Sequence, residues 1–112
     1  MSQSTVIAMA AALGVLCAAA NALAQEPKGD AHAAKQKIAV CEGCHGIAGY
    51  RTAFPVVYHV PMLGGQQAAY IVKALEAYKS GERRHPSMRG IAGSLSEQDM
   101  ADLAAYYSGK TK

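Results

Sequence analysis

The most constraining feature of this 112-residue chain is the pentapeptide Cys41-Glu42-Gly43-Cys44-His45. Cysteines three residues apart lie on consecutive turns at a helix end, so both sulfurs can add to the two vinyl groups along one edge of a porphyrin. The histidine that follows at once then lies beneath the iron, where its Nε2 can serve as the proximal ligand. The motif therefore predicts one haem c, bound covalently through Cys41 and Cys44 and ligated by His45.

Two other kinds of site use the same cysteine spacing. A Cys-x-x-Cys pair without the histidine would also fit a redox dithiol or half of a zinc site. Here the adjacent histidine matches the haem signature, and the sequence has no second cysteine pair, because its third cysteine, Cys17, stands alone. We therefore prefer covalent haem attachment to a dithiol or a metal site.

The amino-terminal segment has the pattern of a secretory signal peptide. Residues 6–23 are almost wholly apolar, and Ala22-Leu23-Ala24 supplies a small-x-small cleavage pattern, although no Lys or Arg precedes the run. The run is at the lower limit of length for a retained membrane anchor, and Cys17 does not follow a small residue, which argues against lipid modification. We expect residues 1–24 to be a signal peptide cleaved after Ala24, and residues 25–112 to form one exported domain. Membrane attachment is expected only if the amino-terminal segment is retained.

Composition limits both the core and the partners of this domain. The chain has no Trp and a single Phe, so a core made of protein alone would be marginal, whereas a haem adds a large apolar surface and two covalent bonds. The formal net charge of +3 is mild and gives no case for nucleic-acid binding.

The part of the chain after Ala24 predicts an all-α domain of three main helices. Asp30 resembles an N-cap for a helix over residues 31–40 that leads into the haem motif. Residues 67–80 give the clearest helix, ended by Gly81, with an apolar side formed by Tyr70, Ile71, Ala74, Leu75 and Tyr78. Ser96 and Asp99 resemble a capping box for a last helix that ends at Gly109 and whose apolar stripe comprises Met100, Leu103, Ala104 and Tyr107.

Two segments between the predicted helices are irregular. Residues 50–61 contain Pro55 and end at Pro61, and we prefer a haem-lining loop there to a strand, because no partner strand is evident. The sequence of residues 82–93 predicts a basic loop. The basic side chains in and beside this loop fit equally a docking patch for an acidic redox partner, contacts to the haem propionates, or solvated charge: Lys79, Arg83, Arg84 and Arg89.

The sixth ligand of the iron decides what such a site can do. Met100 belongs to the apolar stripe of the last helix and is expected in the core, and His32 precedes the motif on the first helix, which points it away from the ring. We prefer Met88, because a loop over residues 82–93 can fold across the opposite face of the haem and Pro86 helps to stiffen it. Three alternatives stay open: Met62, His59 and His85.

These features together resemble a class I c-type cytochrome, in particular the small bacterial single-haem kind that is similar to one half of the periplasmic dihaem cytochromes. The resemblance covers nearly all of the predicted mature chain and rests on Cys41-x-x-Cys44-His45-Gly46, Pro61-x-Leu63-x-Gly65-Gln66, Tyr70, Leu75, Tyr78-x-x-Gly81, Met88, and the stretch from Leu95-Ser96 through Ala105-Tyr106-Tyr107. It implies the small cytochrome c fold around one haem, with His45 and Met88 as axial ligands. It also implies that the Pro61 carbonyl accepts a hydrogen bond from His45 Nδ1, and such an acceptor fixes the tautomer and raises the basicity of the ligand.

An iron with both axial positions filled has no place for substrate or oxygen. The expected function is therefore one-electron transfer through the exposed haem edge, and not catalysis. We expect a periplasmic carrier that shuttles electrons between respiratory redox proteins. Two alternatives are a dedicated cytochrome c subunit of a periplasmic dehydrogenase complex, with the apolar residues 54–60 at its interface, and a haem sensor with an open sixth site.

Overall fold

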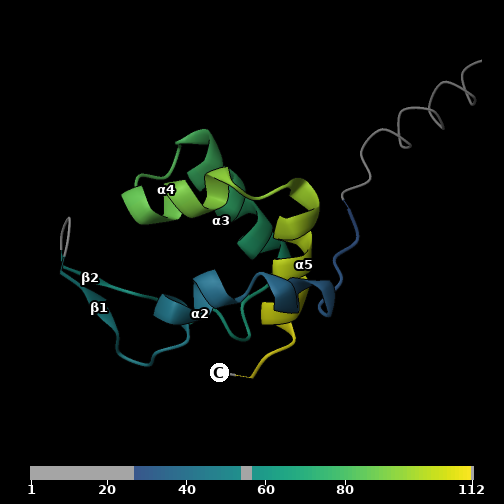
Figure 1. The fold of residues 1–112 in the computed structure, drawn as a ribbon, viewed down its shortest axis with the longest axis horizontal. Helices are drawn as coiled ribbons and strands as arrows, with labels where there is room; N and C mark the ends of the chain where they lie inside the picture. Colours follow the sequence, from purple (N-terminus) through teal and green to yellow (C-terminus); the bar gives the residue numbers. More distant parts are fainter. Residues whose placement is uncertain (1–26, 54–56, 112) are drawn as a thin grey trace, which may run out of the picture.

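The computed structural model describes residues 27–53 and 57–111 (Figure 1). Its elements in chain order are the 3₁₀-helix η1 (Ala33–Gln36), α2 (Ala39–His45), β1 (Arg51–Thr52), β2 (Tyr58–His59), α3 (Ala68–Ser80), α4 (Pro86–Gly93) and α5 (Glu97–Ser108). The described part is mostly helical, which confirms the predicted all-α class. The predicted signal peptide, residues 1–24, lies outside the described residues. Within the described ranges, no helix is both long enough and apolar enough to cross a bilayer.

Helix α5 is the centre of the fold. It packs against both α3 and η1, and α3 also packs against α4 (Figure 1). The predicted apolar stripe of α5 is confirmed, because Met100, Leu103, Ala104 and Tyr107 are all buried. These side chains meet Ala34 of η1, Ile71 of α3, and Leu95 between α4 and α5. Burial of this stripe removes apolar surface from water and so stabilises the packing of α5 against its neighbours.

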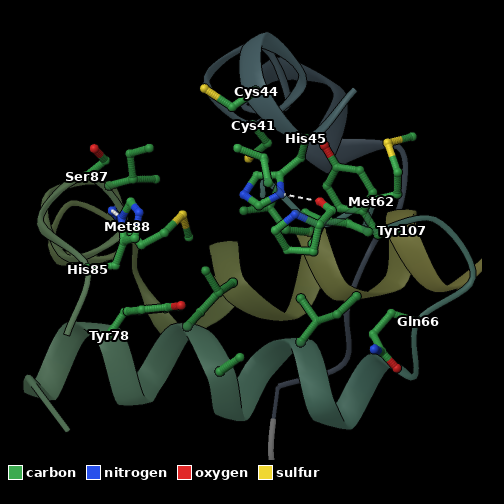
Figure 2. Close-up of a pocket in the computed structure, with 18 of the residues that line it drawn as sticks. Cys41, Cys44, His45, Met62, Gln66, Tyr78, His85, Ser87, Met88 and Tyr107 are labelled. Carbon is green, nitrogen blue, oxygen red and sulfur yellow. Dashed lines mark hydrogen bonds between the residues drawn. The ribbon is translucent and has the colours of Figure 1, made fainter. Parts of the chain in front are cut away.

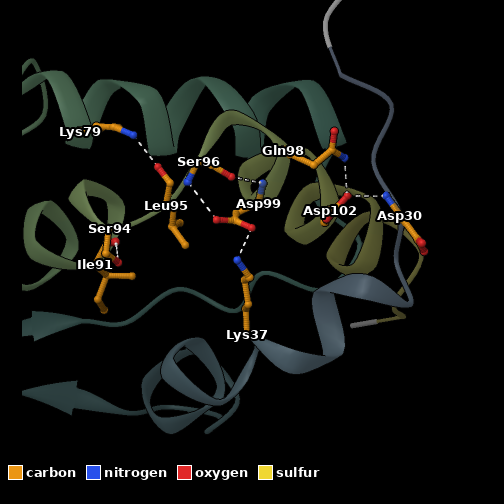
Figure 3. A network of polar contacts seen from close by, with 10 residues as sticks. All are labelled: Asp30, Lys37, Lys79, Ile91, Ser94, Leu95, Ser96, Gln98, Asp99 and Asp102. Carbon is orange, nitrogen blue, oxygen red and sulfur yellow. Dashed lines mark hydrogen bonds and ion pairs between the residues drawn. The ribbon is translucent and has the colours of Figure 1, made fainter.

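The amino-terminal end of α5 carries the predicted capping box. The Ser96 hydroxyl accepts the Asp99 N–H at 3.1 Å, and the Asp99 carboxylate accepts the Ser96 N–H at 2.9 Å. The same carboxylate pairs with the Lys37 ammonium, which lies between η1 and α2 (Figure 3). One side chain thus both starts α5 and ties the segment before α2 to it.

A second carboxylate of α5 holds the segment that precedes η1. Asp102 is buried, and its Oδ1 accepts the Asp30 N–H at 2.7 Å and the Gln98 amide at 2.8 Å (Figure 3). Close approach of the two segments requires glycine at position 29, because a Cβ there would overlap the Ala101 carbonyl. The Asp30 carboxylate accepts the His32 N–H at 2.8 Å. The predicted N-cap was wrong, because η1 begins at Ala33 with His32 as its N-cap and without a side-chain capping hydrogen bond.

The first predicted helix, residues 31–40, is interrupted in the structure. The carbonyl of Ala34 accepts the N–H groups of both Lys37 and Ile38, at 2.8 and 3.1 Å, so the backbone tightens before α2 begins. Helical structure then continues through the cysteine motif and ends at His45. The second predicted helix is confirmed: α3 follows Gln67 and ends at Gly81, whose φ of 89° is the left-handed conformation that glycine adopts freely.

Two segments that were predicted to be loops contain regular secondary structure. Residues 82–93 contain the helix α4, which begins at Pro86 with His85 as its N-cap. Proline is favourable at the first helical position, because its φ is already suitable and its missing N–H would have no partner there. The loop predicted over residues 50–61 contains the antiparallel strands β1 and β2, paired Arg51 to His59 and Thr52 to Tyr58. The partner strand thus lies within the same segment.

Replacing Asp99 with Ala should destabilise the protein by about 1–2 kcal/mol at neutral pH, because it removes a helix cap and an ion pair. The hydrogen bond from Lys37, followed by the backbone hydrogen bond from Ser96, lowers the pKa of Asp99 to about 2. A lowered folded-state pKa means that this stabilisation is complete above the unfolded-state pKa of about 4 and is lost as the pH falls toward 2.

Urea unfolding of wild type and Asp99→Ala at pH 7 and at pH 2 measures this difference. We expect a clear gap at pH 7 that shrinks strongly at pH 2. Glu97→Ala, in the same first turn of α5, is the control and should change stability little at either pH. A stability difference of equal size at both pH values would contradict the stabilising role of the ionised Asp99 carboxylate.

Candidate functional site

All five residues predicted for the site line one cavity. Its walls come from α2, the β1–β2 hairpin, the loop before α3, and helices α3, α4 and α5, and they include Cys41, Cys44, His45, Pro61 and Met88 (Figure 2). The predicted apolar side of α3 also faces this cavity: Tyr70, Ile71, Ala74, Leu75 and Tyr78. Tyr70 is 51% exposed, so it contributes to the cavity wall and not to the core between the helices.

Helix α2 presents the cysteine motif to the cavity. Cys41 and Cys44 are both half-buried on consecutive turns, and His45 is the last residue of the helix. Gly46 closes the helix by donating its N–H to the Glu42 carbonyl at 3.0 Å. A Cβ at position 46 would lie 2.7 Å from that oxygen, so a residue with a side chain would push this turn apart. In the chain before haem attachment, burial raises the pKa of the Cys41 thiol.

The His45 ring is oriented by a backbone carbonyl. Its Nδ1 lies 2.6 Å from the Pro61 oxygen (Figure 2). A carbonyl oxygen can only accept, so Nδ1 donates the hydrogen, and the neutral imidazole keeps an unprotonated Nε2. This is the tautomer that an iron ligand requires.

The candidates for the second ligand are spread around the cavity. Met88 extends from α4 with its sulfur directed into the cavity toward His45, whereas Met62 lies beyond His45, on the side away from Met88 (Figure 2). His59 and His85 also line the cavity. The two candidates that were set aside lie elsewhere: Met100 is in the core at 1% exposure, and His32 is exposed outside the cavity.

His85 has a structural contact that the sequence analysis did not identify. Its Nδ1 accepts the N–H of Met88 at 3.4 Å and so caps α4. Its ring also packs against the edge of Tyr58 from β2, with 5.5 Å between the ring centroids. The signal in the sequence that could have indicated this cap is Pro86, because a proline at the first helical position marks the preceding residue as the N-cap.

Glu42, between the two cysteines, connects the motif to α5. Its Oε1 accepts hydrogen bonds from the Tyr107 hydroxyl and the Lys110 ammonium, each at 3.1 Å. The hydrogen bond from Lys110 is the main reason that the pKa of Glu42 is lowered, whereas burial raises the pKa of Tyr107. No residue pattern in the sequence pointed to this pairing, because the three residues come together only in the folded chain.

The basic residues near the cavity do not act as one group. The Arg83 guanidinium lies 4.7 Å from the centre of the Tyr78 ring and 3.5 Å from the Tyr70 hydroxyl, and it lines the cavity. Lys79 donates to the Leu95 carbonyl at 2.5 Å, which ties the end of α3 to the start of α5. Arg84 and Arg89 are exposed.

This donor set fits a covalently bound haem. Two thiols on consecutive turns, an imidazole with a free Nε2 and a thioether on the opposite wall surround a cavity with a largely apolar and aromatic lining. Thiols add to vinyl groups, and imidazole and thioether are both ligands that haem iron accepts.

Comparison with known proteins gives the same assignment. The cytochrome c family profile matches residues 28–108. The chain is 42% identical to cytochrome c-554(548) of Halomonas halodenitrificans over 71% of its own length and 95% of that protein. It is 41% identical to cytochrome c4 of Pseudomonas aeruginosa, over 71% of its own length and 38% of that protein. The crystal structure of reduced recombinant cytochrome c4 from Pseudomonas stutzeri superposes with a TM-score of 0.60 at 37% identity, covering 74% of this chain and 46% of that one. The chain thus spans less than half of these two cytochrome c4 chains.

Replacing Cys41 or Cys44 with Ala should leave at most one covalent bond to the haem, because each substitution removes one thioether. The mass of the purified denatured chain, together with haem staining after denaturing electrophoresis, measures attachment. We expect wild type to keep its haem under these conditions and each single variant to keep much less. Full retention in both single variants would contradict the two-point attachment, and Ser94→Ala, outside the cavity lining, serves as the control.

Proposed function

This chain belongs to the cytochrome c family, and we propose that it works in the periplasm as a one-electron carrier between respiratory redox proteins. It holds one haem c, bound covalently through Cys41 and Cys44. When bound, the haem supplies the Fe(III)/Fe(II) couple, and the residues around it set its ligation, its orientation and its access to water and partners.

We assign His45 as the proximal ligand, with Pro61 as the residue that orients it. Donation from Nδ1 to the Pro61 carbonyl, at 2.6 Å, leaves the Nε2 lone pair for iron and makes the imidazole more basic. Proline suits this position because its carbonyl accepts while its nitrogen has no hydrogen that could compete.

We assign Met88 as the sixth ligand. The observation that carries the assignment is that the Met88 and His45 side chains face each other across the cavity, from α4 and α2 (Figure 2). His85 does not suit the role, because its Nδ1 accepts the Met88 N–H, so a neutral ring carries its proton on Nε2. Met62 follows Pro61 directly and belongs to the His45 side of the cavity.

This ligation determines the chemistry. A thioether is a soft, neutral ligand that favours Fe(II) and raises the reduction potential. With His45 and Met88 as ligands, a bound haem would have no open position at the iron. We therefore propose that the protein binds no substrate there, is not an enzyme, and exchanges single electrons with protein partners. The carrier role for the whole protein is part of this proposal, and so is the cleavage of residues 1–24 after Ala24 to leave residues 25–112 in the periplasm.

A second candidate is a dedicated cytochrome subunit of a periplasmic dehydrogenase complex. Exposed apolar side chains on the hairpin favour it, since Val57 is 68% and Tyr58 is 55% exposed. A stable interface would cover such residues. We rank this candidate second, because Tyr58 already packs against His85 of the same chain.

Met88→Ala should open the sixth position, lower the reduction potential and leave the haem attached. The measurement is the visible spectrum of the oxidised and reduced protein, with attention to the Met–Fe charge-transfer band at the red end and to carbon monoxide binding by the reduced form. Met62→Ala, which changes a methionine of the same cavity, should keep the band. Unchanged spectra in Met88→Ala would refute the assignment, and a wild-type protein that binds carbon monoxide readily would favour a haem sensor.

Gel filtration of the native protein from periplasmic extract separates the carrier from the subunit. We expect haem absorbance to elute mainly at the size of one mature chain, because a mobile carrier binds its partners only transiently. Elution with a dehydrogenase in a stable large complex would contradict the carrier proposal and support the dedicated cytochrome subunit.

A further inference from the structure

We propose that His85 is a positioning residue for the sixth ligand, and that Tyr58 of the hairpin holds His85 in place. This inference rests on the proposed ligation by Met88. It assigns a role to two residues that line the cavity and contact each other, and it gives the β1–β2 hairpin a part in keeping the iron closed.

His85 is placed to cap the helix that carries Met88. His85 precedes α4 in an extended conformation, with φ of −151° and ψ of 114°, and Pro86 follows at the first helical position. From there its Nδ1 accepts the N–H of Met88, the third residue of the helix. The backbone of the proposed ligand is therefore held directly by the neighbouring imidazole (Figure 2). Loss of this acceptor would leave the Met88 N–H without its partner and loosen the first turn of α4.

The His85 ring also makes a tertiary contact with Tyr58. At 3.4 Å the capping hydrogen bond is long and therefore weak, so a contact that holds the imidazole ring in place helps to keep it. Tyr58 supplies that support, because its ring meets the His85 ring edge-on at 78° with 5.5 Å between centroids. Edge-to-face aromatic pairs are favourable and directional. The contact joins β2 to the start of α4, two segments that line the same cavity.

The tautomer of His85 distinguishes this role from ligation by His85 itself. An imidazole that accepts a hydrogen bond at Nδ1 carries its proton on Nε2 while it is neutral. His85 therefore acts on the iron only through Met88. Any change at His85 should appear in the strength of the Met88 bond, while the haem stays attached through Cys41 and Cys44.

The test compares His85→Leu, which removes the acceptor, with His85→Asn, which restores a good N-cap acceptor without the ring. The readouts are the Met–Fe charge-transfer band and the rate of carbon monoxide binding to the reduced protein, with thermal unfolding measured in parallel. We expect His85→Leu to weaken the band and to raise the carbon monoxide rate about fivefold, the size of effect that loss of a helix cap has. His85→Asn should recover most of the wild-type behaviour.

The hairpin contact is tested by Tyr58→Leu with Tyr50→Leu as the matched control. Tyr50 belongs to the same hairpin segment and is 36% exposed, but it does not line the cavity. We expect Tyr58→Leu to raise the carbon monoxide rate about threefold, in line with the loss of one aromatic pair, and Tyr50→Leu to leave it unchanged.

The variants distinguish failure of the His85 cap, failure of the Tyr58 contact and failure of the Met88 ligation. If His85→Leu lowers only the unfolding temperature and leaves the band and the rate at wild-type values, the role is merely structural and the inference is overturned. Failure of His85→Asn to recover the rate would overturn the capping argument, and equal effects of Tyr58→Leu and Tyr50→Leu would overturn the hairpin contact. A wild-type protein without the band would instead refute the Met88 ligation of the proposed function, and this inference with it.

Discussion

The site depends on one constraint: α2 must stay at a fixed place against α5. This seven-residue helix carries Cys41, Cys44 and His45, yet none of its residues is fully buried, so packing alone holds it weakly. Polar contacts hold the helix at its middle and just before its start. The carboxylate of Glu42 accepts hydrogen bonds from Tyr107 and Lys110, and Lys37, just before the helix, pairs with Asp99 at the start of α5. Buried α5 thereby fixes the position of the haem-binding motif.

The haem is part of the core of this small protein as well as its redox centre. The fully buried apolar residues lie mainly on α5 with single contributions from its neighbours, whereas the apolar side of α3 lines the cavity. A chain without Trp buries little apolar surface against itself, and a covalently attached porphyrin adds the missing surface. Helix α3 therefore contributes to two structures at once: Ile71 packs against α5, and Tyr70 and Tyr78 form part of the wall around the haem site.

Local sequence rules predicted the elements that depend on local chemistry. The Ser96–Asp99 capping box, the Gly81 stop and the apolar stripe of α5 all appear as expected, because each depends on residues within one or two helical turns. The helix α4 was missed: its eight residues include Gly90 and Gly93, which lower helix propensity, and its cap is a histidine rather than the usual small polar residue. The hairpin was missed because its strands are only two residues long and pair within a segment that contains prolines.

The sequence by itself determined the cofactor, because two thiols and an imidazole at that spacing suit little else than covalent haem, and it predicted His45 as the proximal ligand. It also indicated Met88, from its place in the segment between the last two predicted helices, and the family resemblance added Pro61. Only the tertiary structure decided how the candidates are arranged: Met88 facing His45, Met62 on the His45 side, and His85 engaged as a cap. The reason is physical, since residues far apart in the chain become neighbours only when α4 packs on α3 and the hairpin reaches across to His85.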